Sequence, residues 1–233
     1  MAPSAKSLAG YVPVLVALSM TTGCLSEVEE KALGRVAKTV QTTADRPYAK
    51  SRLRQIVRRT PLDPAAWGKG FQSGAAAYPL LAEDVLDRKC RLTGKKARVV
   101  DGYKRPISKP GSKPIAGWTG LMVRTDVLTA RRQLAKAKAG TRNCPDASAG
   151  GSRFLGERLT PMAMPAGVDE MHAVEGTAQN PGAPGYRYVY VLVRKGRFVG
   201  FVMASAWEIE LARAEAPPVV RKLVARLDRQ LNG

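Results

Sequence analysis

The clearest pattern in the sequence is a pair of nearly continuous apolar runs close to the C-terminus. They cover residues 186–194 (YRYVYVLVR) and 197–205 (RFVGFVMAS) and flank Lys195-Gly196. Gly196 tolerates the positive φ angle that a two-residue hairpin turn requires, so the pattern predicts a long antiparallel hairpin. Because apolar residues fill nearly every position, both faces of this hairpin are expected to be covered.

Helical and strand patterns flank this hairpin. Apolar positions recur at helical spacing after Pro218, which predicts a last helix that packs on the hairpin. Asp126 is expected to cap a helix that runs to Ala139 and stops at Gly140. A short apolar helix is predicted over 74–88, and strands over 97–103, 116–124, 154–159 and 171–175. The fold class that follows is α+β, an antiparallel sheet with a long C-terminal hairpin packed against helices.

The N-terminus has the pattern of an export signal. Residues 8–20 (LAGYVPVLVALSM) are apolar, too few to span a bilayer but typical of a signal-peptide core. The segment 20–24 (MTTGC) resembles the lipobox of bacterial lipoproteins, in which the cysteine is lipidated and becomes the first mature residue. Gly23 and Cys24 match it, whereas Thr21 stands where an aliphatic residue is usual. An ordinary secretory signal, or a cytosolic protein with an apolar first helix, are the alternatives.

The segment after Cys24 is strongly basic. Ser26 and Glu29 form a capping box that predicts a helix over 27–42. Residues 46–60 then hold no carboxylate and six cations, which are Arg46, Lys50, Arg52, Arg54, Arg58 and Arg59. Leu53, Ile56 and Val57 give this segment a narrow apolar face. Beside a lipid anchor it fits a membrane-surface helix, and it fits equally an ordinary helix with a solvated face.

These features divide the chain into three parts. We expect a signal peptide over 1–23, a lipid-anchored basic helical arm over 24–61 and an α+β sensor-like domain over 62–233. Export would leave Cys90 and Cys144 as one pair in an oxidising compartment, which predicts a disulfide, and two unrelated buried thiols are the alternative. The protein would then be extracytoplasmic and held to the cell membrane by lipid on Cys24.

Composition narrows the partners. The 38 Lys and Arg residues exceed the 19 Asp and Glu residues, for a net charge of +19. The expected partners are therefore anionic: a membrane surface, a small molecule or an envelope polymer. Nucleic acid is the alternative if the N-terminal run is not a signal, but no helix-turn-helix, zinc-finger or RNP pattern supports it. One histidine and three cysteines leave too few ligands for common zinc or iron–sulfur sites, so no metal or cofactor is expected.

Candidate enzyme chemistry is confined to one neighbourhood. A strand through His172 would place Glu170 on the same face, close enough to orient the imidazole, with Asp169 and Glu175 nearby. The sequence has no nucleophile elbow and no phosphate-binding glycine loop, so the protein is not expected to be an enzyme. A secreted hydrolase that uses His172 is the alternative.

Aromatic residues gather around the predicted sheet and its edges. They either pack in the core or line a cleft between sheet and helices with Arg and Lys at its rim, which would suit an anionic ligand. These residues are Trp67, Phe71, Trp118, Tyr186, Tyr188, Tyr190, Phe198, Phe201 and Trp207.

The order of elements is similar to a known family, the actinobacterial secreted lipoproteins of the sensor-domain type, and to the extracellular sensor domain of mycobacterial serine/threonine protein kinase H. The resemblance covers roughly residues 75–231 and implies a non-enzymatic domain outside the membrane, braced by disulfides, with a ligand cleft. This chain has one available cysteine pair where the kinase domain has two, and no ligand-contacting residue carries over. The matching features are a signal with Cys24, a helix over 126–139 ending near Cys144, the hairpin over 186–205 and a closing helix that begins Ala216-Pro217-Pro218.

Overall fold

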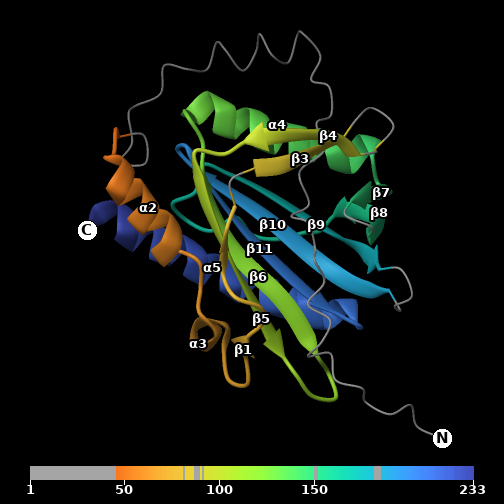
Figure 1. Cartoon of the computed structure of the whole chain (residues 1–233). Helices are drawn as coiled ribbons and strands as arrows, with labels where there is room; N and C mark the ends of the chain where they lie inside the picture. The colour runs from red at the N-terminus through yellow and green to blue at the C-terminus, as the bar shows by residue number, and fades with distance from the viewer. Residues whose placement is uncertain (1–45, 81, 87–89, 91, 150–151, 181–184) are drawn as a thin grey trace, which may run out of the picture.

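The structure, a computed structural model, describes residues 46–80, 82–86, 90, 92–149, 152–180 and 185–233 (Figure 1). Its centre is an antiparallel sheet in the order β1-β5-β6-β11-β10-β9-β8-β7, with β2 paired to β5 as a ninth strand. The strands are β1 (Gln72–Ser73), β2 (Tyr78–Pro79), β5 (Asp101–Lys109), β6 (Ile115–Val123), β7 (Ala147–Ala149), β8 (Ser152–Leu159), β9 (Glu170–Gln179), β10 (Tyr186–Lys195) and β11 (Phe198–Ala206). A separate hairpin joins β3 (Ala82–Leu86) and β4 (Leu92–Arg98). The predicted α+β class with an antiparallel sheet is confirmed.

The predicted C-terminal hairpin forms the middle of this sheet. Lys195 pairs with Phe198, so Gly196 and Arg197 make the turn, one residue later than predicted, and Gly196 has a φ of 54°. All of β11 is buried, as is β10 from Tyr188 to Arg194. Both faces of the hairpin are therefore covered, as the apolar runs indicated.

One face of the hairpin packs on α5 (Ile209–Asn232), as predicted. Alternate residues of β10, such as Val189 and Val191, lie in one core cluster with Val220 and Leu223 of this helix. The predicted start at Pro218 is wrong, because α5 begins at Ile209 and contains Pro217 and Pro218. Ala212 and Ala216, in the first turns of α5, are buried in the same cluster. This contact stabilises the turns that precede the two prolines, although proline usually interrupts a helix.

The other face of the hairpin packs on α4 (Val127–Asn143). Tyr188 and Leu192 share a core cluster with Leu134 of this helix. The Asp126 cap is confirmed, since its Oδ1 accepts a hydrogen bond from the Thr129 amide at 2.6 Å. Gly140 does not stop the helix, which continues to Asn143 because its last turns are buried against the sheet.

The described residues of the segment 74–88, over which a helix is predicted, are not helical. The chain there contributes β2 and β3 instead, and the Leu80 amide donates to the Gly102 carbonyl at 2.8 Å. This approach depends on glycine, because a Cβ at position 102 would collide with the Leu80 carbonyl oxygen. Strand pairing with β5 therefore overrides the local helical pattern. The strand predicted over 97–103 is also displaced, since β4 ends at Arg98 and β5 begins at Asp101.

The basic segment before residue 62 packs on the sheet. It forms α2 (Lys50–Arg59), followed by α3 (Pro64–Trp67). Leu53, Ile56 and Val57 are buried in a third cluster, among residues of β6, β11 and α5. The described part of the expected arm over 24–61, which is α2, thus shares a core with the domain expected over 62–233, and the apolar face that would suit a membrane-surface helix is buried. The expected signal over 1–23, the helix over 27–42 and Cys24 lie outside the described residues.

The burial of α2 has a measurable consequence. Ile56 is 0% exposed, so Ile56→Ala should destabilise the whole domain by about 2–5 kcal/mol, the usual cost of such a cavity. Arg58→Ala, on the exposed side of the same helix, is the matched control and should change stability by less than about 0.5 kcal/mol. Urea unfolding followed by tryptophan fluorescence measures both. An equal, negligible effect of the two substitutions would show that α2 is not part of the core.

Candidate functional site

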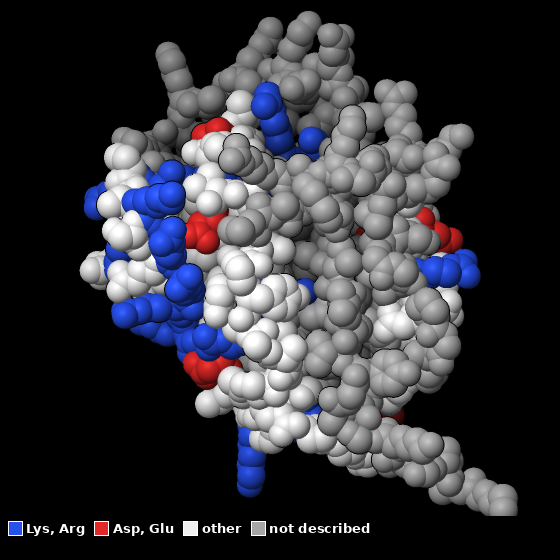
Figure 2. Space-filling view, in the orientation of Figure 1, with Lys and Arg blue, Asp and Glu red and all other residues white. Residues whose placement is uncertain are grey.

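The outer side of α2 is a dense array of cations. With its apolar residues turned into the core, Lys50, Arg54, Arg58 and Arg59 are exposed to solvent. Figure 2 shows Lys and Arg side chains gathered on the left of the view, where α2 lies in Figure 1, with few acidic side chains among them. Arg58 and Arg59 occupy the last turn, where the helix dipole favours positive charge.

Helix α5 extends this surface. Arg52 of α2 donates from Nη2 to the carbonyl of Gln230 at 2.6 Å, which holds the two helices together. Lys222 Nζ donates to the Ala66 carbonyl at 2.7 Å, so this side of α5 lies along the chain that follows α2. We define the basic face as Lys50, Arg54, Arg58, Arg59, Lys222, Arg226 and Arg229.

Among the residues that the structure describes, two carboxylates form ion pairs with the basic face. Arg226 forms an ion pair with Asp63 at 3.0 Å, and Arg54 a longer one with Asp101 at 3.8 Å. Exposed pairs of this kind contribute little to stability and are screened by salt. The cations of the basic face outnumber these two acids, so the face attracts anions.

The sequence identified the α2 part of this face and missed the α5 part. Arg46 is exposed and Arg52 is half-buried, and the Arg52 side chain bonds to Gln55 and Gln230 instead of facing outward. A signal for the missed residues exists, because Lys222, Arg226 and Arg229 recur at helical spacing. The proximity of that stripe to α2 is a property of the tertiary structure.

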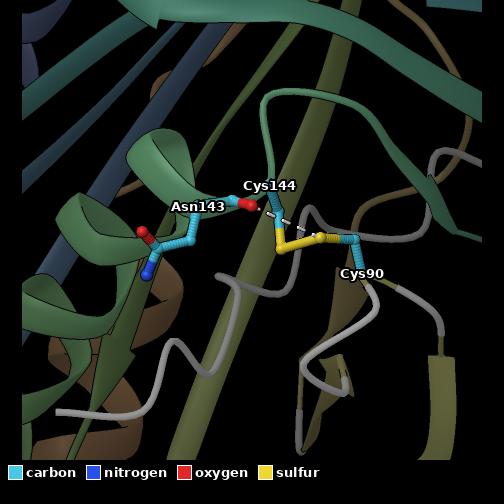
Figure 3. Close-up of a disulfide and its surroundings, with 3 residues drawn as sticks. All are labelled: Cys90, Asn143 and Cys144. Atoms are coloured by element: carbon cyan, nitrogen blue, oxygen red, sulfur yellow. Dashed lines mark hydrogen bonds between the residues drawn. A yellow bond between two sulfur atoms is a disulfide. The ribbon is translucent and has the colours of Figure 1, made fainter.

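The predicted disulfide is confirmed. Cys90 and Cys144 are bonded, with a Cα–Cα distance of 5.6 Å (Figure 3). Cys144 caps the end of α4, where its amide donates to the Gly140 carbonyl at 2.7 Å. Cys90 lies between β3 and β4. The bond therefore ties the connection between these two strands to the end of α4.

His172 belongs to a buried hydrogen-bond network. Its Nε2 lies 2.9 Å from the hydroxyl of Thr141, which also contacts Glu157 at 3.2 Å. Tyr188 donates its hydroxyl hydrogen to the same carboxylate at 3.0 Å. The imidazole is 5% exposed, and burial, together with the positive charges of nearby Lys138 and Arg142, lowers its pKa to about 4.

The acids that lie near His172 in the sequence have other partners. Arg194 donates to Asp169 at 2.8 Å and to Glu170 at 3.0 Å, beside the β10–β11 turn. Glu175 accepts hydrogen bonds from Arg158 and Arg213. The expectation that Glu170 orients the imidazole is therefore wrong, and the partner of His172 is a hydroxyl. Within the described ranges, no group of three His, Cys, Asp or Glu side chains forms a metal site.

This geometry predicts a pH dependence of stability. The unfolded chain protonates His172 near pH 6.5 and the folded chain only near pH 4, so stability from this group falls as pH drops between those values. The loss amounts to about 3 kcal/mol at most. Wild type and His172→Gln should therefore differ in the slope of unfolding free energy between pH 6.5 and 4. Identical slopes in urea titrations would show that His172 is not buried as a neutral group.

Most of the described aromatic residues are buried or partly buried, whereas Tyr78 and Trp207 are 39% and 44% exposed. Trp118, Tyr188, Tyr190 and Phe201 lie in the cluster on the α4 side. A cation accompanies them there, because Lys104 Nζ lies 3.7 Å from the centre of the Trp118 ring. Burial lowers the Lys104 pKa to about 7.

Comparison with known proteins identifies the fold. No protein-family model and no curated protein matches this sequence. The fold is similar to that of an extracellular domain of a mycobacterial protein, as the sequence resemblance implied. One similar structure is the extracellular domain of PknH from Mycobacterium tuberculosis, with a TM-score of 0.54 and 14% identity over 79% of this chain and 99% of that one. An uncharacterized protein (Rv0999 ortholog) from Mycobacterium smegmatis matches with a TM-score of 0.45 and 10% identity, over 70% and 92% of the two chains.

In the part of the chain that the structure describes, no helix combines the length and the apolar character needed to cross a membrane.

Proposed function

We propose that the protein is an extracytoplasmic lipoprotein, lipidated on Cys24, that acts as a non-enzymatic ligand-binding or sensor-like module on an anionic membrane surface. The observation that carries this proposal is the basic face. Because α2 turns its apolar side into the core, the domain meets the membrane through cations and does not insert. The shared fold with an extracellular domain and the lipobox-like segment support the compartment.

With a lipid on Cys24, even a weak attraction between the basic face and the membrane would be enough to keep the domain at the membrane surface. Residues 25–45 connect Cys24 to the described part of the chain and can reach at most about 70 Å, at ~3.5 Å per residue. Such a tether holds the basic face at a high effective concentration near the bilayer. A polybasic surface beside a lipid anchor adds a second attraction to an anionic membrane, at about 1 kcal/mol per basic residue. The anchor and the face would therefore act together.

Export also favours anionic lipid over nucleic acid as the partner of the basic face. Outside the cytoplasm the basic face meets anionic lipid head groups and envelope polymers, and its attraction to either weakens with salt.

The membrane contact can be tested with two double variants that each remove two positive charges. Arg58→Gln with Arg59→Gln alters the basic face, and Arg131→Gln with Arg142→Gln alters α4 on the opposite side of the sheet. In a Cys24→Ala background, binding to phosphatidylglycerol vesicles should fall roughly tenfold to thirtyfold for the first pair, at about 1 kcal/mol per basic residue. The α4 pair should bind like the parent. Cosedimentation with the vesicles measures both.

Each outcome of this comparison is informative. Pure phosphatidylcholine vesicles report the contribution of the apolar N-terminal run, which all variants share. Equal losses for the two pairs would mean that net charge, and not the basic face, drives binding. If the first pair lost affinity for duplex DNA while keeping its affinity for vesicles, the nucleic-acid alternative would replace this proposal.

The lipid anchor is tested separately in cells. A clickable palmitate analogue should label the parent protein and leave Cys24→Ala unlabelled, because that thiol is the acceptor in the lipobox-like segment. Gel fluorescence after the click reaction reads out the label, and immunoblotting controls for expression. Label that persists in the variant, or its absence from the parent, would remove the lipoprotein assignment.

A further inference from the structure

A cavity lies between the β8–β9 connection and α5, and neither the basic face nor the His172 network uses it. Its volume is about 390 Å³, within the usual range of small-molecule sites. Its lining residues come from three separate stretches of the chain. They are Thr160, Pro161, Met162, Val189, Arg213 and Pro217.

The polar side of this cavity is organised by Glu175, which is 4% exposed. Arg213 donates to its two oxygens from Nε and Nη2, at 2.8 and 2.7 Å, in a bidentate pair. Thr160 donates its hydroxyl hydrogen to Glu175 at 3.0 Å, and Arg158 donates from Nε at 2.9 Å. The hydrogen bonds from Arg213 are the main cause of a Glu175 pKa of about 2, so the carboxylate is always ionised at neutral pH.

This arrangement fixes a guanidinium at the cavity wall. Glu175 holds the orientation of Arg213, whose side chain remains 43% exposed and therefore reachable from the cavity. Two guanidinium groups, from Arg158 and Arg213, share this one buried carboxylate, so Glu175 alone does not neutralise both of them. Glu210 also approaches Arg213, at 3.6 Å, but its side chain is 72% exposed and such a pair is weak.

The remaining wall is apolar. Met162 belongs with Val189 to the core cluster on the α5 side, and Pro161 and Pro217 complete the lining. A ligand that fits here needs an apolar body of modest size and one anionic group that can bind the guanidinium edge.

We propose that this cavity binds a small amphiphilic anion, such as a medium-chain carboxylate or an organic sulfonate, with its charge at Arg213 and its apolar part against Met162 and Val189. The inference rests on the proposed ligand-binding function and names the chemical class of the ligand. It is independent of the membrane contact, which involves other residues.

The probe for this site is octanoate, with octan-1-ol as its neutral counterpart, titrated into the full chain by calorimetry. Arg213→Met should weaken octanoate binding roughly tenfold to a hundredfold, the usual value of a charged hydrogen bond, and leave octanol binding unchanged. Arg221→Met, on an exposed part of α5 that does not line the cavity, is the matched control and should bind both like the parent. Met162→Trp should fill the cavity and abolish both.

Further variants distinguish ligand binding by Arg213 from a purely structural role of the Glu175 cluster. Arg158→Met removes another partner of Glu175 without touching the cavity lining, so it should retain octanoate binding. Equal loss in Arg158→Met and Arg213→Met would mean that the cluster only maintains the fold, and would overturn the proposal. So would octanoate binding that is absent from the parent or unchanged in both Arg213→Met and Met162→Trp. Vesicle binding should be the same in all these variants, so failure here leaves the membrane test intact.

Discussion

The burial of both faces of the β10–β11 hairpin is the constraint on which the other contacts depend. Along β10, Tyr188, Tyr190 and Leu192 pack toward α4, while Val189 and Val191 pack toward α5. A strand with apolar residues on both sides exposes too much surface to be stable alone, and each face requires a covering layer. In the third cluster α2 also serves as a covering layer, because its apolar residues pack with Phe198 at the start of β11.

This layering also places the charges. Arg194 is 2% exposed on the largely apolar hairpin, and its guanidinium donates hydrogen bonds to Asp169, Glu170 and the Gly196 carbonyl. A buried charge of this kind is tolerated only when it is paired and hydrogen-bonded. In contrast, α2 buries its apolar residues and leaves Arg54, Arg58 and Arg59 exposed to solvent. The basic face is thus a consequence of core formation.

Local patterns identified the elements that carry strong periodicity or a specific cap. The hairpin, the Asp126 cap and the apolar face of the last helix were predictable, because each depends on residues close together in sequence. The segment 74–88 was misread since its apolar spacing suits a helix, while pairing with β5 through Gly102 decides its conformation. Likewise α5 begins before its two prolines because Ala212 and Ala216 are buried against the sheet.

The sequence by itself determined the α+β class, the long hairpin, the cysteine pair and a basic segment before residue 62. Composition, apolar periodicity and cysteine count are local or additive properties, so they can be read from the sequence without knowledge of the fold. Only the tertiary structure decided which side of α2 faces outward, that Arg226 and Arg229 of α5 join its cations, and that Glu175 and Arg213 meet at one cavity. These placements depend on packing between segments that are far apart in the chain. There the free energy of folding depends on which surfaces become buried together, and local conformational preference does not determine that.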